Sequence, residues 1–156
     1  MNVFRTFLSI AGIFFLCGCD HGINKAPQAR LPIVGTWRLI TGITIDKGDT
    51  VKTDYTKNLS FIKIINDTHF AFLKHDLKNG KDSATAAYDS GGGTYTLTDN
   101  IYTEHLEYCS ERAWEGNDFK FTVSVTQDTL VQTGIEKIEN IGVNRLNIEK
   151  YARLNK

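Results

Sequence analysis

The run Phe119-Lys120-Phe121-Thr122-Val123-Ser124-Val125-Thr126 decides the fold class of this chain. Apolar and polar side chains alternate along all of it, which places the two kinds on opposite faces of a β-strand. The pair Gln127-Asp128 follows and is typical of a tight turn, and the β-branched run Thr129–Ile135 comes next. This segment therefore predicts an antiparallel hairpin.

Short β-branched and aromatic runs continue on both sides of this hairpin, and turn-forming residues separate them. Turns are expected at Asn66-Asp67, Asn79-Gly80 and Asp99-Asn100, and the Asn-Gly pair is the strongest hairpin signal among them. The further strands expected are Val34–Ile45, Leu59–Ile65, His69–Leu73, Thr94–Thr98, Ile101–Tyr108 and Arg145–Leu154.

The part of the chain from Val34 to Leu154 contains no proline, as the central strands of a closed sheet require. Its one helical signal is Ser110–Gly116, where Ser110 can cap a helix of about two turns and Gly116 can end it. About eight or nine strands joined mostly by tight turns predict an all-β fold, an up-and-down antiparallel barrel. Closure of the barrel removes the exposed edges that an open sheet would leave.

The N-terminus has the layout of an export signal. One positive charge, Arg5, precedes the apolar run Leu8–Leu16, which is shorter than the roughly 20 residues of a membrane-spanning helix. Leu16-Cys17-Gly18-Cys19 resembles the bacterial lipobox, and this resemblance implies that Cys19 is acylated and becomes the mature N-terminus. The alternative is an ordinary cleaved signal peptide that ends near a cysteine.

On the lipobox interpretation, residues 1–18 are a lipoprotein signal peptide, 19–32 a lipidated tether and 33–156 the barrel. Both prolines, Pro27 and Pro32, lie in the tether. Removal of Cys17 and acylation of Cys19 would leave Cys109 alone, so no disulfide is expected within the mature chain. The protein is expected in the cell envelope, attached to the membrane by its lipid, and the inner and the outer membrane both remain open.

Length and charge exclude other classes. A chain of 156 residues with 41% hydrophobic residues fits one globular domain. Lys and Arg number 18, and so do Asp and Glu, so no excess of positive charge favours nucleic acid as a partner.

Several motifs, in order, resemble the lipocalins and their relatives, the calycins. Gly35-Thr36-Trp37 resembles their Gly-x-Trp motif, and Thr98-Asp99-Asn100-Ile101-Tyr102 looks like their Thr-Asp-turn-Tyr motif. Arg153 is placed like the basic residue that packs across the motif tryptophan. The resemblance covers essentially all of 33–156. It implies a barrel that can hold a ligand, with Gly35, Trp37 and Arg153 as a structural motif at its closed end.

The fatty-acid-binding proteins, another calycin branch, end in an Arg-x-Tyr pair that holds a carboxylate. The matching positions here look like Glu149 and Tyr151, and a glutamate there would repel a fatty acid. Their helical lid follows the first strand, where this chain has the segment Asp46–Asn58, which is too short and too polar to form one.

The residues do not form a catalytic or metal-binding pattern. A strand, not a helix, follows Gly91–Gly93, so the triplet is not a phosphate cradle. His69, His75 and His105 lack zinc-site spacing, and Cys109 lies about 13 Å from His105 if both are on one strand. We therefore expect no enzyme, no metal and no cofactor.

Two classes of function remain open. One is a lipid-anchored protein that binds a small, partly apolar or amphiphilic molecule in its barrel; the other is a barrel filled by its own side chains that binds an envelope protein. Glu104 lies on a strand face that points either into the barrel or into solvent, and if it points inward its charge needs partners there. Alternation from Trp37 fixes the inward face of the first strand, and on the other strands the apolar face is taken as inward where one exists. The candidate ligand-binding side chains lie on these inward faces. They are Trp37, Leu39, Tyr95, Leu97, Tyr102, Glu104, Tyr108, Phe119, Phe121 and Tyr151.

Overall fold

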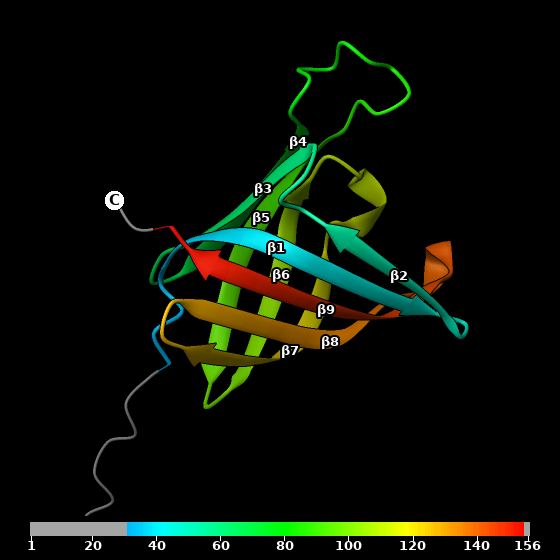
Figure 1. Cartoon of the computed structure of the whole chain (residues 1–156). Coiled ribbons are helices and arrows are strands. Elements are labelled where there is room, and N and C mark those ends of the chain that lie inside the picture. Colours follow the sequence, from blue (N-terminus) through cyan, green and yellow to red (C-terminus); the bar gives the residue numbers. More distant parts are fainter. Residues whose placement is uncertain (1–30, 155–156) are drawn as a thin grey trace, which may run out of the picture.

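Nine antiparallel strands follow one another through the computed structural model, which describes residues 31–154. Each strand from β3 onward pairs with the next in sequence, and β9 returns to pair with β1 (Figure 1). Eight strands, β1 and β3–β9, thus close a barrel, and β2 is an extra strand on β1. The all-β barrel prediction is confirmed. The strands are β1 (Gly35–Asp46), β2 (Asp49–Asp54), β3 (Leu59–Ile65), β4 (His69–Asp76), β5 (Tyr88–Thr98), β6 (Ile101–Cys109), β7 (Asn117–Thr126), β8 (Thr129–Ile138) and β9 (Val143–Arg153).

The strand β2 has no counterpart in the sequence prediction. The first half of β1 pairs with β3, and the second half pairs with β2 on the same side. Lys47 and Gly48 both have positive φ, 50° and 94°, as a two-residue hairpin turn requires. The polar segment after β1 is therefore a hairpin arm beside the barrel, where the fatty-acid-binding proteins have their lid.

Three of the expected turns join consecutive strands as predicted, at Asn66-Asp67, Asp99-Asn100 and Gln127-Asp128. Asn79-Gly80 also turns, with φ of 55° and 69°, but it lies within the longer loop 77–87 between β4 and β5. The prediction of a tight hairpin there is wrong. The buried Asp76 carboxylate organises the loop instead, accepting hydrogen bonds from backbone N–H groups on both of its arms.

The helix expected at 110–116 is reduced to a single 3₁₀ turn, η1 (Arg112–Trp114). Ser110 does not cap it, because its hydroxyl donates to the Asp89 carboxylate at 2.6 Å. A second 3₁₀ turn, η2 (Glu139–Ile141), links β8 to β9. No helix within 31–154 is long and apolar enough to cross a membrane.

Bulges change which side chains point inward. The β1–β9 register shifts at Ile40, so that Thr44, and not Ile43 or Ile45, faces the barrel interior. The β5–β6 register shifts at Glu107 in the same way. Strict alternation therefore assigns the wrong face to the later residues of both strands.

One end of the barrel is closed by its own core. The Trp37 indole is fully buried and donates to the Ile33 carbonyl at 2.7 Å, and the Arg153 guanidinium lies 4.0 Å from the indole centroid. Arg153 also donates to the Val34 and Pro32 carbonyls. The structure thus places Arg153 across Trp37 as the resemblance implies. At this end the chain enters the barrel.

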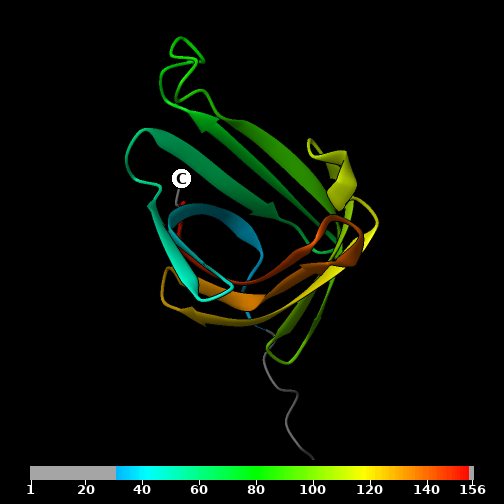
Figure 2. The same cartoon turned by 90° about the vertical axis from the view of Figure 1, so that its right-hand side faces the viewer.

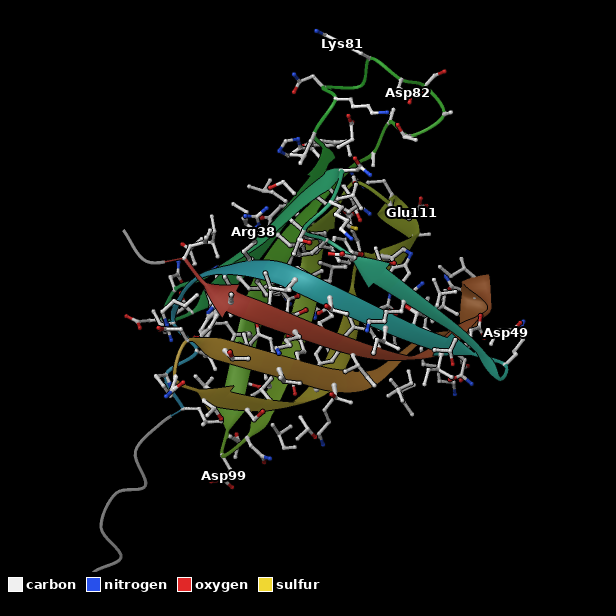
Figure 3. The ribbon with its side chains drawn as sticks, viewed as in Figure 1. Arg38, Asp49, Lys81, Asp82, Asp99 and Glu111 are labelled. Carbon is white, nitrogen blue, oxygen red and sulfur yellow. The ribbon has the colours of Figure 1, made fainter. Side chains whose placement is uncertain are left out.

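The opposite end of the barrel carries the longer connections. Figure 2 views the barrel from that side, with the strands forming a closed ring. Figure 3 marks both ends: Asp99 lies in the β5–β6 turn at the closed side, whereas Glu111 lies beside η1 and Lys81 and Asp82 lie at the tip of loop 77–87.

Candidate functional site

A cavity of about 650 Å³ occupies the interior between the closed end and η1. Phe61, Phe119 and Phe121 line its walls, and Tyr88 and Glu111 lie at its exposed rim. The phenylalanines therefore do not fill the barrel.

The predicted site residues fall into three groups. Glu104, Phe119, Phe121 and Tyr151 line the cavity. Five others belong to the packed core of the barrel and do not line the cavity. The last of the ten, Tyr108, faces away from the cavity. The core residues are Trp37, Leu39, Tyr95, Leu97 and Tyr102.

The assignment of Tyr108 to an inward face is wrong, because its side chain is 68% exposed. Glu107 is the extra residue of the bulge between β5 and β6, so alternation reverses after Leu106. The Glu107 carboxylate holds the bulge by accepting from the backbone N–H and hydroxyl of Thr94. Cys109 takes the inward place instead and lines the cavity.

Glu104 points inward, which decides between the two faces that the sequence left open. Its carboxylate is buried and pairs with the Lys63 ammonium at 2.7 Å. Lys63 also donates to the Gln132 amide oxygen at 3.1 Å. This cluster forms the polar floor of the cavity.

The two charges of the floor affect one another. Burial lowers the pKa of Lys63, but the carboxylates of Glu104, Glu149 and Glu136 outweigh burial and hold it above its usual value. Burial also raises the pKa of Glu104, although Lys63 opposes the shift. The buried Tyr102 hydroxyl lies next to this pair and makes no well-aligned hydrogen bond.

A second charged cluster lies toward the rim. Glu136 accepts from the Arg145 guanidinium at 2.6 Å and from the Asn147 amide at 2.9 Å. The Arg145 guanidinium also lies 5.0 Å from the Trp114 ring centroid, so it connects β9 to η1. Burial raises the pKa of Glu136 even though Arg145 opposes it.

Between these clusters lies Glu149. Its carboxylate accepts a hydrogen bond from the Tyr151 hydroxyl at 2.7 Å, and both residues line the cavity. A hydrogen bond therefore joins Glu149 and Tyr151 on one face of β9. These are the two positions that look like the carboxylate-binding pair of the fatty-acid-binding proteins.

Sequence reasoning missed several cavity residues: Tyr55, Lys63, Gln132, Glu136, Arg145 and Asn147. Two of their strands carried a usable signal. Lys63 shares the phase of Phe61 and Ile65 in β3, and Arg145, Asn147 and Glu149 share the phase of Tyr151 in β9. A polar residue in phase with buried aromatic residues is the mark of a charged interior. Tyr55 lies outside any strand and carried no such signal.

Other candidate chemistry is absent from the described part of the chain. No group of three His, Cys, Asp or Glu residues within 31–154 could hold a metal ion. His105 faces outward, where it contacts Asp118 at 2.6 Å, whereas Cys109 faces the cavity. Burial raises the pKa of the Cys109 thiol, which disfavours a nucleophilic thiolate.

The closed eight-strand antiparallel barrel with one extra strand is consistent with a lipocalin-like barrel, and its internal cavity is charged and aromatic. No protein-family model matches the chain, and no curated protein matches it. Among solved structures, a point mutant of the fluorescent protein UnaG matches with 9% identity over 80% of this chain and 97% of that one, at a TM-score of 0.36. A likeness this distant carries no information on function. The function is therefore inferred from the cavity and the residues that line it.

Proposed function

We propose that this chain is a lipid-anchored binding protein that holds a small, partly apolar molecule inside its barrel. The cavity of about 650 Å³ carries the proposal. Its volume lies within the range of about 300–1,000 Å³ that is common for small-molecule sites. Aromatic walls would bury the apolar part of a ligand, and the fixed polar groups of the floor would orient its polar part.

The cavity also favours binding over the alternative of a filled barrel that acts through its outer surface. Phe61, Phe72, Phe119 and Phe121 line an open space and do not fill the interior of the barrel. Binding is also favoured over catalysis, because no histidine of the described chain lines the cavity and burial raises the pKa of its one thiol, Cys109. Membrane attachment through Cys19 remains part of the proposal, and Cys19 lies outside the described residues.

Native mass spectrometry of the protein, extracted from its own cells, tests the proposal. We expect a stoichiometric small-molecule adduct in addition to any lipid carried covalently. Thr44→Trp places a large side chain into the cavity and should abolish the adduct, whereas Ile43→Trp, on the outward face beside it, should not. A clean mass without adduct, or an adduct that Thr44→Trp leaves unchanged, would contradict binding in the barrel.

A further inference from the structure

The ligand class follows from a carboxylate in the cavity that makes no ion pair within the described chain. Glu149 lies on β9 opposite Gly42 of β1 and Gln132 of β8. Its carboxylate accepts a hydrogen bond from the Tyr151 hydroxyl. No Lys, Arg or His of the described chain lies within ion-pair distance of this carboxylate. A partly buried carboxylate of this kind attracts a cation that enters the cavity.

The basic side chains of the cavity are already committed. Lys63 pairs with Glu104 at 2.7 Å, and Lys74 pairs with Asp89 at 3.3 Å. The third, Arg145, pairs with Glu136 at 2.6 Å. An anionic ligand would therefore find no free cation among these residues and would meet the charge of Glu149. Two cavity carboxylates are left without an ion pair in the described part of the chain, Glu111 and Glu149, and because Glu111 is exposed at the rim, Glu149 is the site for positive charge inside the cavity.

Aromatic rings surround the place that such a charge would take. Gly42, opposite Glu149, has no side chain, and the Tyr55 ring lies over it, where a Cβ would come within 3.0 Å of that ring. The ring centroids of Tyr55 and Phe61 lie 5.8 Å apart, with the rings edge to face, and those of Phe61 and Tyr151 lie 6.4 Å apart. All three rings line the cavity. Ring faces attract cations, and organic ammonium groups are recognised in this way.

The interior already contains one complete example of this arrangement. The Lys63 ammonium pairs with Glu104 and lies 5.5–5.9 Å from the ring centroids of Phe70, Tyr102 and Tyr151. Glu149, with its own neighbouring rings, offers the same components without the cation.

We infer that the barrel binds an organic ammonium compound with an apolar or aromatic tail. Its charge pairs with Glu149 and lies against the rings of Tyr55, Phe61 and Tyr151. The inference rests on the proposed function, because it names the ligand class for the same cavity.

Calorimetric titration with a matched series of probes tests the inference: 4-phenylbutylamine, 4-phenylbutyltrimethylammonium, 4-phenylbutanol and 4-phenylbutanoate. The four share one tail and differ in their head group. We expect the two cations to bind at least about tenfold more tightly than the alcohol, and the carboxylate to bind most weakly. Equal or tighter binding of the alcohol or the carboxylate would overturn the ammonium assignment while leaving the barrel a binding protein. If none of the four probes binds, the result counts against both the ammonium assignment and the proposed binding function.

Variants then locate the site. Glu149→Gln keeps an acceptor for Tyr151 and should weaken both cations about tenfold or more, with little effect on the alcohol. Glu139→Gln removes the same charge from the exposed η2 turn outside the cavity and should leave all affinities unchanged. Tyr55→Leu should reduce the preference for the trimethylammonium probe over the alcohol, and it tests the rings should Glu149→Gln fail to fold. Cation binding that neither cavity variant alters would overturn the assignment.

Discussion

The cavity floor depends on two residues that must stay together. Lys63 and Glu104 have side-chain exposures of 4% and 9%, so each charge has lost nearly all of its water. Their attraction and the Gln132 contact offset that cost, and neither charge is stable there alone. The polar floor of the cavity is therefore stable only while both residues of the pair are present.

Lys63→Met should destabilise the protein by about 3–5 kcal/mol, because it leaves Glu104 buried without a cation. The double variant Lys63→Met with Glu104→Leu should recover most of this loss, since both desolvated charges are then removed. Urea unfolding followed by tryptophan fluorescence measures both. A double variant no more stable than Lys63→Met would show that the pair is not the source of the loss.

Gly35 is required by two independent constraints. Its φ of 146° is unfavourable for other residues, and a Cβ would come within 2.5 Å of the Arg153 guanidinium that covers Trp37. Gly35→Ala should therefore lower the unfolding free energy by about 2–3 kcal/mol. Gly48→Ala is the matched control, with φ of 94° and no atom within 4 Å, and should cost less. Equal losses in the two variants would mean that the Arg153 contact is irrelevant.

At the scale of elements, loop 77–87 depends on one carboxylate. Asp76 accepts from the backbone N–H of Lys78 at 2.8 Å, of Gly80 at 3.1 Å and of Ala87 at 3.2 Å. The bonds from Gly80 and Ala87 hold the pKa of Asp76 below its ordinary value of 3.8. The folded loop thus favours the ionised form, and its stabilisation is present above 3.8 and lost as the pH falls through the folded pKa.

Acid should therefore loosen this loop before it opens the barrel. We expect the Gly80 and Ala87 amide signals in NMR spectra to change with a midpoint below pH 3.8, while amides of the central strands stay unchanged. Asp76→Asn should remove this transition. A midpoint at or above 3.8, or a transition that persists in Asp76→Asn, would contradict the role assigned to Asp76.

The elements also show how far the sequence leads. Alternation in β7 and the turn pairs at Asp99-Asn100 and Gln127-Asp128 predicted their hairpins, because local pairing and local pattern agree there. Alternation failed beyond Ile40 and Glu107, where a bulge adds one residue and reverses the faces. A bulge is stabilised by distant contacts, which a single strand's pattern does not contain.

The candidate site was predictable only in part for the same reason. Phe119 and Phe121 follow from the pattern of one strand, but the partners of Glu104 do not. Lys63 is 41 positions away in sequence, and Gln132 lies on yet another strand. Barrel closure brings these residues together, so the ion pair appears only in three dimensions.

At the scale of the whole molecule, membrane attachment is a prediction about Cys19. Metabolic labelling with a clickable palmitate analogue should mark the protein, and Cys19→Ala should abolish the label. Cys109→Ala is the matched control, because that thiol lies in the folded barrel and should not affect labelling. Equal labelling of Cys19→Ala would exclude acylation at this site.

The placement of the two barrel ends gives the last prediction. Ile33 and Val34 join the barrel at the closed end, beside Trp37 and Arg153, whereas the cavity rim lies at the opposite end with Glu111. An anchor that precedes residue 31 therefore attaches away from the opening. The lipidated protein in phosphatidylcholine vesicles should bind 4-phenylbutylamine within about twofold of a form without lipid that begins at residue 20, since a factor of two is under 0.5 kcal/mol. Affinity at least tenfold lower on vesicles would show that the membrane covers the opening and would contradict this orientation.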